Sequence, residues 1–225
     1  MRGATFEEKL ELGEETASSV ARYLNGAPGA RVMVADRTVS GAAFRDAHGL
    51  PVPDLLKITS GMEPQYVEVK SKAEWFQRGG NHGPLETFME DRHLQAYERV
   101  GINHGIPVVL IFVIRGHLNA GYLEKQLHRL GVVKPPRGHA GCYYAKIVDL
   151  KAWAATAPKR KAGGQSGFAL LRQCDGGPLR PLAPWDEATK SIPLDEASWA
   201  AWRAIEPGTA KPLAPLTCQT VPQCG

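Results

Sequence analysis

Apolar residues recur every three or four positions near the start of the chain, which predicts an amphipathic helix. Glu15 falls opposite the apolar face of this helix, whereas Glu14 falls on its edge. We therefore expect Glu15 to be solvated and Glu14 to lean over the buried side. The apolar face comprises Phe6, Leu10, Ala17, Val20, Ala21 and Leu24.

Short runs with strand composition follow this helix. Residues 31–35, 55–58 and 65–70 are rich in apolar and β-branched side chains, as expected of strands. Ser60 and Gly61 supply a turn between the second and third of these runs. The last two runs are therefore predicted to lie side by side in one sheet.

A second helix and a buried strand are predicted next. Residues 91–100 have helical spacing, and Gly101 is expected to end the helix. Residues 107–114 form a continuous apolar run, which is typical of a central strand covered on both faces. The order helix, three strands, helix, strand predicts an α/β protein with a central mixed sheet flanked by helices.

The pattern becomes weaker beyond this core. Residues 120–130 and 149–157 suit short helices, and residues 143–148 suit a strand, which we expect at a sheet edge. These elements complete a predicted first domain over residues 1–157.

The last part of the chain has a different composition. Eight prolines follow Cys174, so little regular structure is expected there apart from a helix at 195–205. We predict that Trp199 and Trp202 of this helix pack on the core, because packing is the commoner fate of tryptophan. Residues 158–225 are thus expected to be a basic linker and a proline-rich extension that packs on the core or is partly disordered.

Three charged residues gather at the predicted strand pair. Asp54 precedes the run 55–58, and Glu68 and Lys70 lie two positions apart in the run 65–70. Side chains two apart on a strand share a face, and the turn would bring Asp54 near Glu68. Two carboxylates beside one ammonium suit a divalent metal ion that activates a water next to a phosphate.

The spacing of these three residues resembles a known signature. Asp54 followed by Glu68-Val69-Lys70 resembles the PD-(D/E)xK motif of metal-dependent nucleases, a superfamily that includes restriction enzymes, Holliday-junction resolvases and RecB-type exonucleases. The resemblance covers about residues 5–115 and implies a restriction-endonuclease-like αβββαβ core. It also implies Mg²⁺, with Mn²⁺ as a substitute, held by Asp54 and Glu68, with the Val69 carbonyl as an extra ligand.

The resemblance assigns a role to the first helix. Gly13-Glu14 with Ala17 resembles the Gly-Glu-x-x-Ala pattern of resolvase-like members, in which the helix supplies another acidic residue to the metal site. Glu14 is therefore the expected additional ligand. A helix-edge glutamate without a role is the alternative.

The second helix carries a partial motif. His93 and Tyr97 occupy the positions of the Q-x-x-x-Y motif of RecB-like members, with histidine in place of glutamine. This resemblance implies that they contact the nucleic acid or orient the attacking water. A helix histidine that only packs or caps is the alternative.

Further candidates for nucleic-acid contact lie in two polar segments. Arg78 and His82 belong to a glycine-rich loop after the third predicted strand, where backbone amides can approach a phosphate. Lys159, Arg160 and Lys161 form a basic run, which can follow a phosphate backbone. An ordinary loop and a solvated charged surface are the alternatives.

Composition limits the remaining possibilities. The net charge of +4 is compatible with a polyanionic partner. The four cysteines contain no C-x-x-C pair, so no zinc site is expected. No apolar run is long enough to span a membrane, and no signal peptide is visible, so a soluble cytoplasmic protein is expected.

These observations predict a Mg²⁺-dependent deoxyribonuclease. No base-reading motif is visible, so structure- or end-directed cutting of DNA is expected, with RNA as an alternative substrate. Cleavage of both strands would require a homodimer or a partner protein. A non-cleaving DNA-binding module of the same fold and an unrelated soluble α/β protein are the competing interpretations.

Overall fold

The computed structural model of the protein describes six stretches of the chain, and they fold into a mixed α/β structure. These stretches are residues 6–34, 49–72, 75–77, 84–116, 140–162 and 164–206. The expected helix at 120–130 lies outside them. The helices are α1 (Phe6–Asn25), α2 (Asp91–His104), α4 (Ile147–Ala154) and α5 (Glu196–Ile205), with a short 3-10 turn at Gln173–Asp175.

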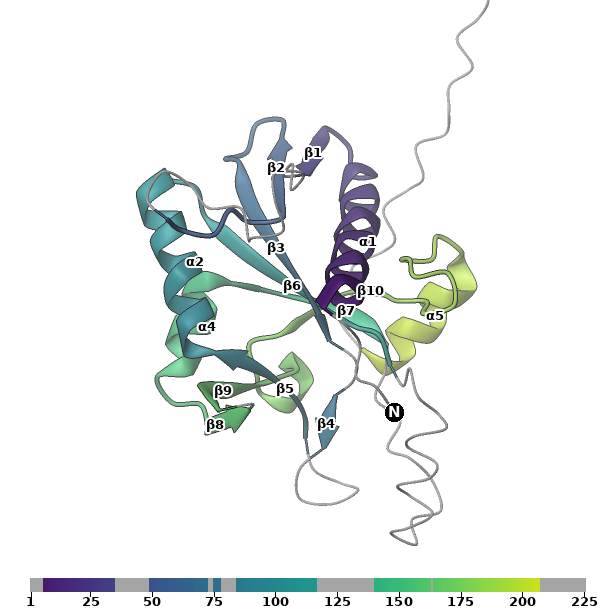
Figure 1. Cartoon of the computed structure of the whole chain (residues 1–225). Coiled ribbons are helices and arrows are strands. Elements are labelled where there is room, and N and C mark those ends of the chain that lie inside the picture. The colour runs from purple at the N-terminus through teal and green to yellow at the C-terminus, as the bar shows by residue number, and fades with distance from the viewer. Residues whose placement is uncertain are drawn as a thin grey trace, which may run out of the picture.

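A six-stranded sheet forms the centre of the molecule (Figure 1). Its order is β1-β2-β3-β6-β7-β10. Only β3 and β6 run parallel, and every other neighbouring pair is antiparallel. The strands are β1 (Ala30–Val34), β2 (Leu55–Thr59), β3 (Gln65–Lys72), β6 (Val108–Ile114), β7 (Gly141–Lys146) and β10 (Arg180–Pro184).

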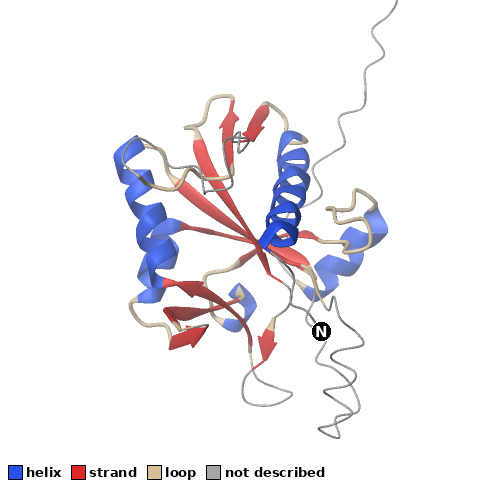
Figure 2. Ribbon diagram, in the orientation of Figure 1, coloured by secondary structure: helices blue, strands red, loops and turns tan. Residues whose placement is uncertain are grey.

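Helices cover both faces of this sheet (Figure 2). α1 and α5 lie on one face, where Tyr23 and Trp199 stack with ring centroids 6.1 Å apart. α2 and α4 lie on the other face. The sequence prediction of a central mixed sheet flanked by helices is thus confirmed, and the predicted order of the first six elements is present.

A second, smaller sheet extends from the central one beside α2. It has the order β4-β5-β9-β8, and β4 and β5 are inserted between β3 and α2. The sequence analysis missed these two short strands. The strands are β4 (Phe76–Gln77), β5 (Leu85–Glu90), β8 (Lys159–Ala162) and β9 (Gln165–Leu171).

The core is built around β6, the predicted buried strand. Leu110, Phe112 and Ile114 of this strand are almost fully buried, as is Leu55 of β2. An uninterrupted apolar sequence is required there because helices cover both faces of β6.

The end of α2 differs from the sequence prediction. The helix continues past Gly101 to His104 and ends at Gly105, which has the left-handed φ of 64°. Gly101 instead allows close packing, because a Cβ there would lie 3.3 Å from the carbonyl oxygen of Ile106. Glycine ends a helix where the backbone must turn left-handed, and of these two glycines it is Gly105 that has this conformation.

The described C-terminal residues, which reach residue 206, belong to the fold. β7, expected at a sheet edge, is an interior strand, because β10 pairs with it on its outer side. The segment expected to be a linker and an extension also provides β8, β9 and α5. Trp199 and Trp202 are buried, as predicted.

None of the described helices is both long enough and apolar enough to cross a lipid bilayer.

Candidate active site

The β2–β3 hairpin brings two acidic side chains together. Leu55 pairs with Val67, so the preceding Asp54 lies beside Glu68. The amide of Val69 donates a 2.7 Å hydrogen bond to Asp54 Oδ2, and the amide of Asp54 donates a 3.3 Å bond to Glu68 Oε2. The backbone of each strand thus holds the carboxylate of the other.

Both carboxylates are deeply buried. Asp54 is 3% exposed and Glu68 is 5% exposed. Burying a carboxylate is costly unless hydrogen bonds or an opposite charge compensate for the lost hydration. The fold therefore holds two negative charges close together in its interior. An ordinary pattern of charged residues on an exposed strand would not bury them.

Lys70 neutralises part of this charge. It points to the same side of β3 as Glu68, and its Nζ lies 2.7 Å from Glu68 Oε1. The same Nζ donates a 3.1 Å hydrogen bond to the hydroxyl of Tyr97 and lies 5.1 Å from the centre of that ring. The ammonium is thus held on two sides while a quarter of the side chain stays exposed.

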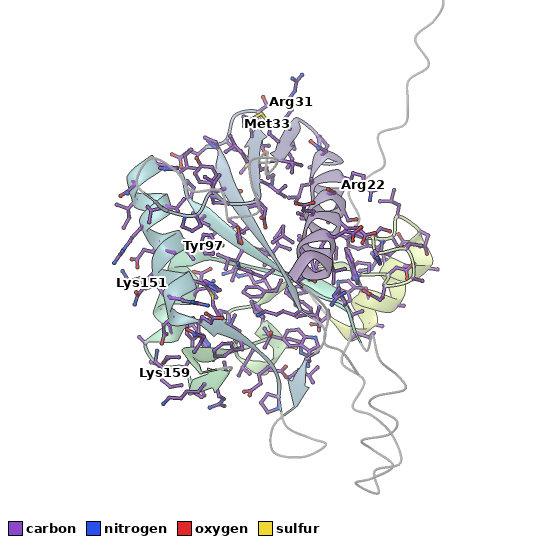
Figure 3. All side chains as sticks on the ribbon, viewed as in Figure 1. Arg22, Arg31, Met33, Tyr97, Lys151 and Lys159 are labelled. Atoms are coloured by element: carbon purple, nitrogen blue, oxygen red, sulfur yellow. The ribbon has the colours of Figure 1, made fainter. Side chains whose placement is uncertain are left out.

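Tyr97 connects α2 to this cluster. Its side chain points from α2 toward the sheet (Figure 3), and its hydroxyl donates a 2.5 Å hydrogen bond to Glu68 Oε1. Tyr97 is 5% exposed. The helical spacing in the sequence predicted that Tyr97 lies on the same face of this helix as His93. In the structure Tyr97 contacts both Glu68 and Lys70.

The peptide of Val69 lies beside Asp54. Its amide faces Asp54, and in a strand the amide and carbonyl of one residue point to the same side. The Val69 carbonyl therefore lies on the edge of β3 that faces the carboxylates, as a main-chain metal ligand would require.

Glu14 does not join this group. It is exposed on α1, which covers the face of the sheet opposite α2, whereas Glu68 and Lys70 point toward α2. Within the described residues, no group of three or more His, Cys, Asp or Glu side chains is placed to hold a metal ion. The structure thus brings together two of the three expected carboxylates.

His93 lies one helical turn before Tyr97, at the side of the cluster. Its Nε2 is 3.9 Å from Glu90 Oε2. Burial lowers the pKa of His93, the nearby Lys70 lowers it further, and Glu90 opposes these effects. The imidazole is therefore favoured in its neutral form near the site.

One residue near the site was missed in the sequence analysis. Lys72 follows Lys70 by two positions and lines the same small cavity as His93. Strand alternation, which predicted that Glu68 and Lys70 share a face, applies equally to Lys72. Burial and the charge of Lys70 lower the pKa of Lys72.

The predicted basic run lies on β8 and is partly used in contacts within the fold. Lys159 bonds to Asp91 at 3.1 Å, and Arg160 binds Glu86 at 3.2 Å. Lys161 is exposed. The other two candidates for nucleic-acid contact, Arg78 and His82, lie outside the described residues.

Comparisons with known proteins show a distant likeness to a solved structure. No family model and no curated protein matches the chain. The 1.6 Å structure of Hjc, a Holliday junction resolvase from the archaeal hyperthermophile Archaeoglobus fulgidus, aligns with 71% of this chain and 83% of its own, at 14% identity and a TM-score of 0.36.

The donor set at this site fits a small, hard cation. Carboxylate and carbonyl oxygens are the ligands that Mg²⁺ prefers, and Mg²⁺ keeps several waters when few protein ligands are present. Asp54, Glu68 and the Val69 carbonyl provide such oxygens, and the ammonium of Lys70 can interact with a bound anion from the side.

Proposed function

We propose that the protein is a metal-dependent nuclease that hydrolyses phosphodiester bonds of DNA. The observation that supports this function is the convergence of Asp54, Glu68 and Lys70 in one hydrogen-bonded cluster. A chance surface pattern would not require burial of both carboxylates, which costs free energy.

Asp54 and Glu68, with the Val69 carbonyl, would hold Mg²⁺, and Mn²⁺ could substitute for it. The bound ion would supply positive charge to the phosphate oxygens and lower the pKa of a water. Asp54 and Glu68 are held by main-chain amides, so they need little reorganisation when the substrate binds. Glu14, by its position on the opposite side of the sheet, is not part of this set.

Lys70 orients the attacking water and stabilises the charge that develops on the phosphate oxygens. In hydrolysis the water gives up a proton as its oxygen forms a bond to phosphorus, the bond to the leaving oxygen breaks, and the leaving oxygen takes up a proton. Tyr97 keeps the ammonium of Lys70 in place through its hydroxyl and ring. Fixing a charged group in advance is the main way in which such sites accelerate reactions.

DNA is the proposed substrate, cut in a structure- or end-directed manner, with RNA as the alternative. A homodimer or a partner protein would be needed to cut two strands. Lys161 and the polar side of α2 are the described surfaces from which further contacts with the phosphate backbone could come.

The test is a cleavage assay with Mg²⁺ or Mn²⁺ on supercoiled plasmid, linear duplex, single-stranded DNA, a four-way junction and RNA. We expect metal-dependent cutting that EDTA stops. Lys70→Ala and Asp54→Asn should reduce the rate by about a hundredfold to a thousandfold. Asp54→Asn retains an oxygen that can accept the Val69 amide, so its fold should persist.

Lys146→Ala is the matched control, because Lys146 is exposed and lies on β7, which β6 separates from the β3 strand that carries Glu68 and Lys70. It should cut like the unmodified protein. Equal cleavage by folded Asp54→Asn would refute the assignment of the site. Binding of DNA without cleavage of any substrate would favour a non-cleaving module, and neither binding nor cleavage would favour an unrelated α/β protein.

A further inference from the structure

A small cavity lies beside the Glu68–Lys70–Tyr97 cluster. Its volume is about 70 Å³, and its polar lining consists of Lys70, Lys72, Glu90 and His93. A space of this size accommodates several waters or a small anion. Phe112 contributes to the apolar floor, so charged groups that line the cavity are partly shielded from solvent.

Strand geometry places Lys72 in line with the proposed catalytic lysine. Lys70 and Lys72 lie on the same face of β3, separated by two residues and therefore by about 7 Å along the strand. This separation is comparable to the distance between neighbouring phosphates of one nucleic-acid strand. A strand whose scissile phosphate lies at Lys70 could therefore present its next phosphate to Lys72.

The charges around the cavity are not balanced. Among the described residues, the ammonium of Lys72 makes no hydrogen bond or ion pair, and it lies near the positive charge of Lys70. Glu90, the acidic side chain in the cavity lining, is bonded through Oε2 to Arg92 Nε at 2.5 Å. A half-buried ammonium without a close partner costs free energy that a bound anion would recover.

The protonation preferences point the same way. Burial is the main cause that lowers the pKa of both Lys72 and His93, and Lys70 lowers both further. An anion in the cavity would oppose both effects and favour the charged forms. Glu90 already raises the pKa of Lys72 and of His93, and Arg92 lowers the pKa of His93. A bound anion would raise both pKa values further.

We propose that this cavity binds the backbone phosphate next to the one that is cut, with Lys72 and His93 as its ligands. The identity of the ligand rests on the proposed nuclease function. The existence of an anion site does not, because it depends only on the cavity and its cations. Lys72 is thereby a substrate-positioning residue that is separate from the metal ligands.

The experiment uses the full chain without metal, so that binding is measured without cleavage. Imidazole signals of His93 are assigned in NMR spectra by comparison with His93→Gln. They are then followed during titration with inorganic phosphate, with a short single-stranded oligodeoxynucleotide, and with the same oligonucleotide carrying uncharged methylphosphonate linkages. Lys72→Gln is the test variant, and Lys146→Gln removes one exposed lysine at the other end of β6 as the control.

We expect phosphate and the charged oligonucleotide to shift the His93 signals and raise the pKa of His93, with the oligonucleotide acting at lower concentration. Lys72→Gln should weaken this binding about tenfold or more, because one charge-assisted contact is lost. Lys146→Gln should show the same shifts of the His93 signals as the unmodified protein. The methylphosphonate oligonucleotide should cause no shift of these signals.

Two results would overturn the proposal. If the His93 signals do not respond to either anion, or respond equally in Lys72→Gln, the cavity is no anion site. If only inorganic phosphate acts, the assignment to a backbone phosphate is wrong. Metal-dependent cleavage without any response of the His93 signals would refute this anion site alone. Anion binding without cleavage of any substrate would refute the nuclease function alone.

Discussion

Single residues hold the proposed catalytic groups in place, and Tyr97 is the clearest example. Its hydroxyl lies between Glu68 and Lys70, and its ring lies next to the ammonium. Removing only the hydroxyl would leave the ring packed but release one contact to each of these side chains. The role of Tyr97 can therefore be separated from its contribution to the core.

Tyr97→Phe is expected to lower the rate of metal-dependent cleavage about tenfold, because one hydrogen bond to a charged group is lost. The free energy of unfolding should fall by only about 1 kcal/mol. Cleavage kinetics and denaturant unfolding measure the two effects. Tyr144→Phe, which removes a hydroxyl from a half-buried tyrosine of β7, should leave the rate unchanged, and an equal loss in both variants would contradict a positioning role.

The close approach of Asp54, Glu68 and Lys70 could be predicted from the sequence because all three lie on one short hairpin. Their positions follow from strand alternation and one turn. The exclusion of Glu14 could not be predicted in this way, because it depends on which face of the sheet α1 covers. Lys72 could have been found from alternation alone, but its charge matters only beside His93, which the long-range packing of α2 brings near.

At the scale of elements, α5 is fixed by a cap at its start and by close packing near its end. The Asp195 side chain accepts a 2.8 Å hydrogen bond from the Ser198 amide, and Trp202 packs against Gly141 of β7. A Cβ on Gly141 would lie 2.0 Å from the Trp202 ring. These two contacts can be tested separately.

Gly141→Ala is expected to lower the free energy of unfolding by about 1–3 kcal/mol, because the added methyl group forces the buried Trp202 ring to move. Gly13→Ala is the control. Gly13 lies within α1 with open space around it, so alanine there should raise stability by about 0.5–1 kcal/mol. Denaturant unfolding measures both, and no loss in Gly141→Ala would mean that α5 can shift freely.

The cap on α5 should make stability depend on pH. The Ser198 amide, and then the Ser198 hydroxyl, lower the pKa of Asp195 below its ordinary value of 3.8. The contribution of the cap is thus present above that value and is lost as the pH falls through the lower folded-state pKa. Asp195→Ala should lower the Tm at pH 7, and the difference should shrink under strongly acidic conditions. Asp195→Asn, which keeps the cap without titrating, is the control, and a difference that is constant with pH would contradict this account.

Proline misled the sequence analysis of β10. Pro181 and Pro184 argue against a strand, because proline cannot donate a ladder hydrogen bond. β10 is nevertheless a strand of the central sheet, and it lies at the edge, where proline is tolerated. The edge position in the sheet therefore allows this proline-containing segment to form a strand. The local sequence does not show which position in the sheet a segment will take.

At the scale of the whole molecule, a buried charged network joins the end of α5 to the sheet. Glu206 is 1% exposed and binds Arg172 Nη1 at 2.8 Å and the Tyr143 hydroxyl at 2.9 Å. Arg172 also binds Asp175 at 2.8 Å. The described C-terminal residues are therefore tied to β7 and to the turn after β9.

Arg172→Met is expected to destabilise the protein by about 3–5 kcal/mol, because it removes the positive charge that compensates the buried carboxylate of Glu206. Arg180→Met should cost less than about 1 kcal/mol, since Arg180 is exposed and lies 3.8 Å from Asp149. Denaturant unfolding compares the two. Adding Glu206→Leu to Arg172→Met should recover part of the loss, and the absence of any recovery would show that lost packing, rather than lost charge compensation, is responsible.

The place of β10 in the sheet has a consequence for how the chain is made. A ribosome releases the N-terminal part first. The hairpin that carries Asp54 and Glu68 can therefore form before β10 is available to pair with the outer side of β7. Until residues 180–184 emerge, the backbone groups of β7 that pair with β10 are open to pairing with other chains. β10, which is made late, thus protects the edge of β7 from aggregation. Chains that end before β10 should collect in inclusion bodies although they contain every residue of the proposed catalytic cluster.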